Sequence, residues 1–545
     1  MKLFSFFFLA FFINIFFPNH QEVVYIRCNQ VGYLPGDLKS AKIFSADSLS
    51  ENSFEIINQA DQKNVFTGKL INLKGDINDF HFFYSADFSS LKIPGKYFIR
   101  AGNAASPVFE IGNKIYNRVV DSLMLFLKVQ RCGPTNPLLH RTCHLWDVAR
   151  IQDEKINRQI DVTGGWHDAG DYLKFVSTTA YTTYLLIFSF EFDNQKFGFD
   201  NDHNQVPDVL EEAKIGIDWL LRCNFAQDSL ITRVQDLRDH SAKWRLPEDD
   251  SLRYDRVGIT SVTKSEAGIY SAALALAARI WIEKFKSVEL AKQCLNSALN
   301  IYNVKDSFPV SDVEDSLMYP DKNFYGKFEL AAAELFNTTG DSTFLKEAVQ
   351  YGDSAKADYW WSYGDINSLA HYILAKHVPR FEKFIEENIS EFNRRMHKSV
   401  FNEGAGYSWG TTTTFLGISL QSILLSDLNT NYSGDSLSVF QRDYILGRNL
   451  WGYSFIHNIG TTFPIQQHSQ VGYFNNGYLP GALSSGPAPS KLFKQYRINL
   501  KADRQNKFNY DSLQFNDIYS DFISNEPTIV GNITALFVMG YYSQR

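Results

Sequence analysis

Two aspartates lie three residues apart in the segment GGWHDAGDYLKF, residues 164–175 of the 545-residue chain. Glycines flank Asp168 and Asp171, so we expect the backbone there to be a loop or a helix entrance. Two carboxylates this close repel each other, so one of them can hold its proton more tightly, and together they can grip a water molecule. An aspartate here can also cap the helix that follows, but capping explains only one of the two.

A second acidic segment lies near the C-terminus and reads FNDIYSDFISNEPTIVGN. Glu526 stands between an asparagine and a proline, directly before the last helical pattern. An acidic residue at a helix N-terminus is also favoured by the helix dipole, which by itself explains Glu526 equally well. Asp517 and Asp521 nearby can be ordinary loop residues.

Cysteines and histidines are concentrated in the segment QRCGPTNPLLHRTCHLWD. Cys132 and Cys143 can form a disulfide. Alternatively, these two thiolates, His144 and one further imidazole can form a closed tetrahedral zinc site. His140 and His167 both qualify as the fourth ligand. A zinc site that includes His167 would tie this segment to the aspartate loop, and catalytic side chains need such fixed positions.

The elements that must hold these residues fall into two parts. Residues 21–112 contain short segments rich in Phe, Ile, Tyr and Val, separated by turn residues about every ten positions, which is typical of a small β-sandwich. From residue 113 to residue 545 apolar residues recur at helical spacing and predict about twelve helices with few strands. Twelve helices in antiparallel pairs can close into a ring whose long loops, 130–165, 227–262 and 449–525, form a groove at one end.

Composition indicates a globular protein and excludes some partners. Hydrophobic residues make up 44% of the chain, charged residues 21% and aromatic residues 15%, so a large core is expected and some aromatic rings can line a groove. The net charge is −7, and no basic segment has the density of a nucleic-acid binder.

The N-terminal segment MKLFSFFFLAFFINIFFPNHQ has one lysine, an apolar run and then polar residues. We interpret residues 1–20 as a signal peptide, because the run is short for a membrane span. The protein is therefore expected to be exported, periplasmic or secreted, to keep no membrane span after cleavage, and to be a monomer. Five cysteines do not suffice for a disulfide scaffold.

Several segments together resemble a known family. GGWHDAGD and DFISNEPTIVGN resemble the two acidic motifs of glycoside hydrolase family 9, and DYILGRNLWGYSF resembles another of its segments. IRCNQVGYLP resembles the start of the immunoglobulin-like module that precedes one branch of the family. The resemblance implies a small all-β immunoglobulin-like sandwich at 21–112 followed by an all-α (α/α)6 barrel at 113–545. It also implies inverting hydrolysis of β-1,4-glucan-type chains.

The same resemblance implies roles for the acidic residues. Asp171 would be the general base that activates water, Asp168 would help to position that water, and Glu526 would be the general acid. Asp517 matches an acidic position of the C-terminal signature and would support the site. Inversion requires acid and base carboxyls roughly 6.5–9.5 Å apart, and the acid needs a raised pKa.

One segment departs from the family pattern. His468, in FPIQQHSQV, occupies the place of the family's active-site histidine, but Gln470 stands where the family usually has arginine. Losing that arginine removes a charged, forked hydrogen-bond donor from the groove. This favours a branched or substituted glucan such as xyloglucan, or exo action on short chains, over plain cellulose as the substrate. Mixed-linkage glucan also remains a candidate. The alternatives are a glycan-binding protein on a decayed scaffold and an exo-acting, oligosaccharide-trimming glycosidase.

Two metals are considered. The family branch with the N-terminal module implies a structural zinc held by Cys132, Cys143, His144 and His167. Calcium is common in the family, and the segment LPEDDSLRYD, residues 246–255, offers carboxylate oxygens, although a solvated acidic loop explains it equally well.

Four tryptophans in loop-like contexts can either stack on sugar rings or belong to the core: Trp166, Trp244, Trp409 and Trp451. Of these, Trp166 and Trp409 are predicted to bind substrate, together with Gln470.

Overall fold

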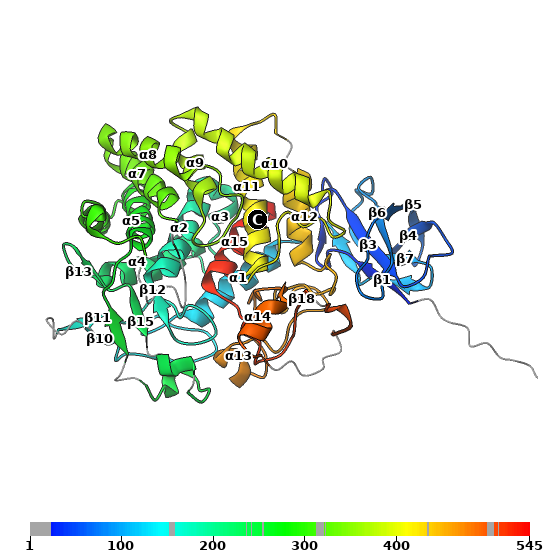
Figure 1. The fold of residues 1–545 in the computed structure, drawn as a ribbon, viewed down its shortest axis with the longest axis horizontal. Coiled ribbons are helices and arrows are strands. Elements are labelled where there is room, and N and C mark those ends of the chain that lie inside the picture. Colours follow the sequence, from blue (N-terminus) through cyan, green and yellow to red (C-terminus); the bar gives the residue numbers. More distant parts are fainter. Residues whose placement is uncertain are drawn as a thin grey trace, which may run out of the picture.

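The computed structural model describes residues 23–151, 158–235, 237–240, 242–252, 256–311, 321, 323–432, 435–498, 506–510 and 512–545. A β-rich N-terminal part lies beside a larger helical part (Figure 1). The predicted signal peptide falls outside the described residues. No described helix is both long enough and apolar enough to cross a bilayer.

The N-terminal part is a two-sheet sandwich in which one long strand serves both sheets. The strand order is β1-β3-β6-β5-β4-β7-β9-β2, and β5 pairs with β6 through one half and with β4 through the other. Buried apolar residues alternate with exposed ones along β4 and β7, as expected for strands with one face on a core. The strands are β1 (Val24–Arg27), β2 (Gly32–Tyr33), β3 (Ser40–Ser45), β4 (Ser53–Asn58), β5 (Asn64–Leu73), β6 (Phe82–Asp87), β7 (Gly95–Ala101), β8 (Ala104–Ala105) and β9 (Phe109–Ile111).

The helical part is a closed double ring, which confirms the predicted barrel. Six inner helices pack each against the next, and the last packs against the first. They are α2 (Val176–Phe192), α5 (Lys264–Phe285), α7 (Tyr325–Thr339), α9 (Asn367–Ala375), α11 (Thr411–Leu428) and α15 (Ile529–Tyr542). Each also packs against one outer helix of the set α1 (Asn117–Gln130), α4 (Asp208–Cys223), α6 (Val288–Tyr302), α8 (Ser342–Ala355), α10 (Glu382–Met396) and α12 (Asp435–Ile445).

Sequence pattern distinguishes the two rings. Helices α2, α11 and α15 are buried along almost their whole length and are apolar on all sides, as expected for helices enclosed by others. Helices α4 and α10 instead bury one stripe. Because inner and outer helices alternate along the chain, the inner helices all run in the same direction, and the loops before them meet at one end of the barrel.

Short strands cover that end, where only loops were predicted. A five-stranded sheet has the order β11-β10-β16-β15-β12 and draws on two of the three long segments expected to form the groove. Its strands are β10 (Val148–Ile151), β11 (Gln159–Asp161), β12 (Lys174–Phe175), β15 (Arg233–Gln235) and β16 (Val257–Ile259). The remaining short elements include α3 (Asn194–Phe197), α13 (Gln470–Phe474), α14 (Ser490–Gln495), β13 (Asn224–Ala226), β14 (Ser229–Leu230), β17 (Ala488–Pro489) and β18 (Leu513–Gln514).

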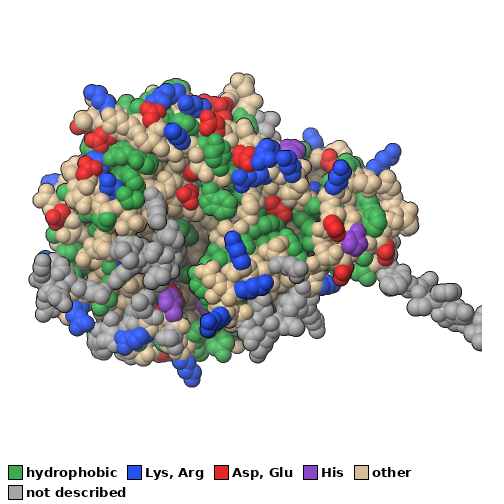
Figure 2. All heavy atoms as spheres, in the orientation of Figure 1, with side chains coloured by type: hydrophobic (Ala, Val, Ile, Leu, Met, Phe, Trp, Pro, Cys, Tyr) green, Lys and Arg blue, Asp and Glu red, His purple; other side chains and the backbone are tan. Residues whose placement is uncertain are grey.

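Buried polar contacts fasten the sandwich to the barrel. Arg442 of α12 donates to Asp37 over 2.9 Å, and Asn29 donates to Asp443 over 2.8 Å. These side chains are buried, so separating the two parts would expose or orphan charged groups. On the face that Figure 2 shows, lysine and arginine side chains are scattered among acidic ones instead of forming one patch.

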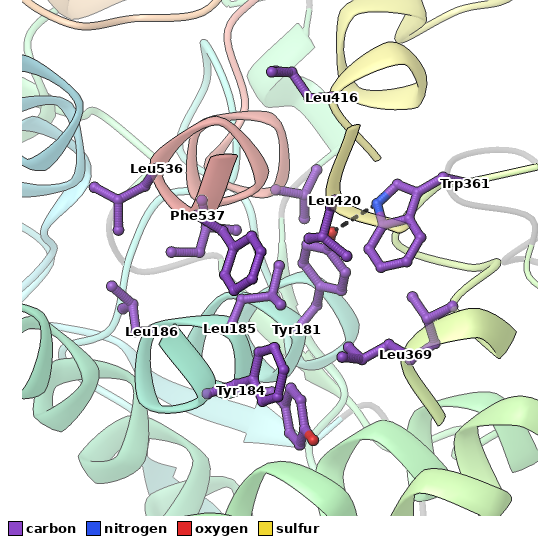
Figure 3. Packing of buried hydrophobic residues seen from close by; sticks show 14 of the residues in the cluster. Tyr181, Tyr184, Leu185, Leu186, Trp361, Leu369, Leu416, Leu420, Leu536 and Phe537 are labelled. Atoms are coloured by element: carbon purple, nitrogen blue, oxygen red, sulfur yellow. Dashed lines mark hydrogen bonds between the residues drawn. The ribbon is translucent and has the colours of Figure 1, made fainter. Parts of the chain in front are cut away.

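The barrel interior is filled by interlocking large side chains (Figure 3). Trp361 is fully buried, and its indole N–H donates to the Tyr181 hydroxyl over 3.1 Å. Gly417 of α11 lies directly against this indole, because a Cβ built there would stand 1.9 Å from the ring. The helix can approach the indole only because residue 417 has no side chain.

We therefore expect Gly417→Ala to lower the free energy of unfolding by about 2 kcal/mol, the usual range for overpacking a dense core. Gly406→Ala is the matched control, since a Cβ there meets no atom within 4 Å. Urea unfolding of both variants checks this. Equal stability of the two would contradict the packing argument.

Candidate active site

The two predicted acidic motifs meet at one end of the barrel. The Ile529 N–H donates to the Asp168 carbonyl over 3.0 Å, which joins the start of α15 to the aspartate loop. The Gly170 N–H donates to the Glu526 carboxyl over 3.2 Å. Asp168 is only 2% exposed, and its N–H donates to the Leu173 carbonyl. Segments more than 350 residues apart therefore form one site.

Asp171 is paired with a histidine that sequence reasoning missed. His240 lies at the end of a single helical turn, Leu237–His240, and its Nδ1 is 3.2 Å from the Asp171 carboxylate. Burial favours the neutral acid, but the hydrogen bond and charge of His240 outweigh it and leave the pKa of Asp171 below its ordinary value. The same bond raises the pKa of His240. Asp171 is therefore held ionised.

Glu526 has the opposite electrostatic environment. Burial, followed by the negative charge of Asp171, raises the pKa of Glu526 well above its ordinary value, and the Gly170 N–H offsets this only in part. The pKa values of the two carboxyls are thus shifted in opposite directions. Opposite shifts of this kind are what a general acid and a general base require.

His468 lies between the two motifs. Its N–H donates to the Asn525 carbonyl over 3.0 Å, and its ring Nδ1 donates to the Tyr519 carbonyl over 2.6 Å. Burial lowers the pKa of this imidazole. A Cβ at position 170 would stand 2.0 Å from the His468 carbonyl oxygen, so only glycine fits there.

Asp517 supports the segment that carries His468. Its carboxylate accepts the backbone N–H groups of Ile465 over 3.0 Å and of Gln466 over 2.7 Å. This is a positioning contact, as expected for a residue that was predicted to support the site without acting as the acid.

The structure corrects two substrate-binding predictions. Trp166 is fully buried in the core, and its indole N–H donates to Glu212 over 2.8 Å, so it has no face for a sugar. Gln470 is 3% exposed, and its side-chain carbonyl accepts the Arg245 N–H over 3.1 Å. Gln470 therefore joins two loops. Both misassignments arose because proximity in sequence does not show which way a side chain points.

Two other tryptophans lie near the acid and base. Trp409 is 41% exposed, with Phe522 at 5.7 Å between ring centroids, and Phe522 in turn lies 5.8 Å from His468. The half-buried Trp244 lies 5.2 Å from His468 and 5.3 Å from Tyr473 of α13. Trp451 is 1% exposed and belongs to the core. Trp244 and Trp409 therefore remain the candidate sugar platforms.

The four predicted metal ligands converge. One ligand atom from each of Cys132, Cys143, His144 and His167 lies within 4.8 Å of all the others, and all four side chains are buried. The measured separations are 3.7 Å from Cys132 Sγ to His144 Nδ1, 3.9 Å from Cys143 Sγ to His167 Nε2, and 3.2 Å between the two histidine nitrogens. Ligands at about 2.0–2.3 Å from a tetrahedral zinc are themselves about 3.3–3.8 Å apart, so the donor set fits.

The structure shows neither a Cys132–Cys143 disulfide nor His140 as the fourth ligand of this cluster. Cys132 and Cys143 are both free thiols. The ring nitrogens of His140 face the backbone carbonyls of Val129 and Arg141, so His140 is not a ligand.

Two acids of the predicted calcium segment have other partners. Glu248 pairs with Arg141 over 3.1 Å, and the buried Asp250 contacts both His144 and Arg245. A different acidic group lies on the loop before α4, where the carboxylates of Asp200, Asp202 and Asp208 come within 4.8 Å of one another. Calcium binding itself stays a prediction.

The two acidic motifs thus meet at one end of a ring of six inner and six outer helices, and comparisons with known proteins identify the family. Residues 116–539 match the model of glycosyl hydrolase family 9, and residues 21–106 match that of the cellulase N-terminal Ig-like domain. The chain therefore belongs to glycosyl hydrolase family 9.

Its similarity to individual relatives is distant but extends over most of the chain. Endoglucanase D of Acetivibrio thermocellus is 24% identical over 92% of this chain and 83% of its own length. The xyloglucan-specific endo-beta-1,4-glucanase BoGH9A of Bacteroides ovatus is 22% identical over 94% of each chain. The crystal structure of a metagenome-derived family 9 endoglucanase has a TM-score of 0.83 and 25% identity, covering 96% of this chain and 99% of its own.

The ion pair at Asp171 predicts how this carboxyl titrates. Replacing His240 by glutamine removes the positive partner, so the pKa of Asp171 should rise. We expect its carboxyl carbon, followed by NMR of protein with labelled aspartate, to titrate at higher pH than in the wild type. His377→Gln is the control, because this histidine contacts Asn337 on the surface. An unchanged titration in His240→Gln would show that the ion pair does not set the pKa.

Proposed function

We propose that the protein hydrolyses β-1,4-glucan chains with inversion at the anomeric carbon. The observation that carries this proposal is the opposite pKa shift of two neighbouring carboxyls, lowered at Asp171 and raised at Glu526. Inverting hydrolysis needs one ionised base and one protonated acid on opposite faces of the sugar.

In the proposed reaction Asp171 removes a proton from a water molecule that Asp168 helps to hold. The water oxygen bonds to the anomeric carbon while the bond to the leaving oxygen breaks. Glu526 donates its proton to that oxygen, so the products are a new chain end and a hemiacetal of inverted configuration. Asp168 is buried and Glu526 is only partly exposed, which limits the contact of this centre with bulk water.

We propose a substituted β-1,4-glucan such as xyloglucan as the preferred substrate. The relatives named above are an endoglucanase and a xyloglucan-specific endo-glucanase. Within this chain, Trp244 contacts His468 directly and Trp409 contacts Phe522, which contacts His468. Both tryptophan rings suit stacking on a glucan backbone, while position 470 supplies no arginine. Because these relatives are named as endo-acting enzymes, we favour cleavage within the glucan chain over trimming from its end.

We propose that the cluster of Cys132, Cys143, His144 and His167 holds a structural zinc ion. Four protein ligands close the coordination shell, so the ion would supply folding stability and not a reactive water. His144 and His167 flank the aspartate loop, so the ion would hold Asp168 and Asp171 in place.

We also propose export through the N-terminal segment and action as a monomer.

Glu526→Gln tests the proposed function. It should lower the hydrolysis rate of xyloglucan and mixed-linkage glucan by about 10²–10⁴-fold, the usual contribution of a general acid, while oligosaccharide binding persists. Reducing-sugar release and calorimetry measure the two quantities, with exposed Glu289→Gln as control.

The configuration of the first product tests whether hydrolysis proceeds with inversion. Proton NMR of the first wild-type product should show the α-anomer, and a β-anomer would refute inversion. A wild type as inert as Glu526→Gln on a broad glycan panel, with binding retained, would instead favour the glycan-binding reading.

Zinc is tested by elemental analysis. We expect about one zinc per chain in the wild type and almost none in a Cys132→Ser, Cys143→Ser double variant, with a lower melting temperature, because structural zinc contributes directly to folding. Cys294→Ala, in the buried face of α6, is the control that should keep its metal. A zinc-free wild type with oxidised Cys132 and Cys143 would favour a disulfide.

A further inference from the structure

The described residues 237–240 and 242–250 contact both Asp171 and the aromatic rings around His468. They include His240, which contacts Asp171, and Trp244, which contacts His468. His240 ends a single helical turn and Trp244 lies outside any helix or strand, so the loop itself must be fixed for these contacts to persist.

Arg245 lies at the centre of this loop and is 9% exposed. Its Nε donates to Asp250 over 2.6 Å, and its Nη2 donates to Asp239. Its backbone N–H donates to Gln470, and its guanidinium lies 5.4 Å from the centre of the Tyr172 ring. A planar guanidinium can hold two carboxylates at once at fixed angles, which a lysine cannot do.

Each of the two carboxylates leads to a different centre. Asp250 is 3.0 Å from Nε2 of His144, the ring nitrogen that points away from the Cys and His cluster. Asp239 accepts the N–H of Tyr172, the residue directly after Asp171, over 3.0 Å. A carboxylate on the outer nitrogen of a metal-bound histidine fixes the orientation of that ring.

We propose that Arg245 is a positioning residue that couples the metal cluster to the catalytic base through Asp250 on one side and Asp239 on the other. The inference rests on the proposed function for its kinetic consequence, but the physical link is independent of it. In the glycan hydrolase, Arg245 keeps His240 against Asp171 and Trp244 against His468, and Asp250 transmits the order of the metal cluster to this loop.

The link is tested in the full-length protein with Arg245→Gln, the conservative Arg245→Lys, and Asp250→Asn. Arg380→Gln is the matched control, because Arg380 also forks onto a carboxylate, Asp353, but on the exposed surface of the barrel. Each protein is assayed for zinc affinity by chelator competition, for kcat and KM on xyloglucan oligosaccharide, for the pH profile of kcat/KM, and for thermal unfolding.

We expect zinc affinity to fall about tenfold or more in Arg245→Gln and Asp250→Asn, the usual effect of losing a partner of a metal ligand. In Arg245→Gln kcat should fall about tenfold, and KM should rise because Trp244 is also displaced. The acid limb of the pH profile should move to higher pH, because His240 no longer holds Asp171 ionised. Arg245→Lys should show a smaller change in each quantity than Arg245→Gln. The control Arg380→Gln should leave all of these quantities unchanged.

A merely structural arginine would lower the melting temperature and leave the zinc affinity, the pH profile and the kcat of the folded fraction unchanged, and that result overturns the proposal. Arg245→Lys and Asp250→Asn keep size and packing, so they supply the comparison if Arg245→Gln does not fold. A wild type without hydrolytic activity would refute the proposed function instead, and the zinc affinities would still decide whether the link exists.

Discussion

The hydrogen bond from the Gly170 N–H to the Glu526 carboxyl joins the two ends of the helical ring, and the site depends on it. It brings the loop before α2, the first inner helix, to the loop before α15, the last. The neighbouring contact from Ile529 to the Asp168 carbonyl fixes the same junction. Because the ring closes here, residues from both ends of a long domain share one buried volume, and no side chain larger than hydrogen fits at position 170.

Burial at this junction has different consequences for the two carboxyls. It raises the pKa of Glu526, since the charged form loses hydration and faces Asp171. It would do the same to Asp171, but His240 supplies a compensating positive partner. The difference between the pKa values of the two carboxyls therefore depends chiefly on the His240 imidazole, with smaller contributions from the Leu173 N–H and from His468.

A second buried cluster lies beside the aspartate loop. His167 is one of the four candidate metal ligands, whereas the carbonyl of Asp168, the next residue, accepts the N–H of Ile529 at the start of α15. The two sites share a backbone and are joined again through Asp250, Arg245 and Asp239. Placing rigid ligation next to reactive groups reduces the freedom of the reactive groups without using their own side chains.

Much of this was accessible from the amino-acid sequence. Short segments rich in Phe, Ile, Tyr and Val between turn residues predicted the sandwich, and apolar residues at helical spacing predicted the paired helices. The acidic motifs and the Cys and His residues are visible as local patterns, whereas the choice of His167 over His140 as fourth ligand came from the family resemblance. Closure of the ring could not be predicted from the sequence, because periodicity shows that a helix has a buried face but not which helix covers that face. Nor could the sequence predict that His240 pairs with Asp171, or that the side chains of Trp166 and Gln470 are buried.

The sequence by itself determined which chemical groups are present and which short elements carry them. Only the tertiary structure decided which groups meet and which are removed from water. The reason is physical: residue type and local period depend on near neighbours along the chain, whereas desolvation, ion pairing and the choice between core and groove depend on residues that can be 405 positions away.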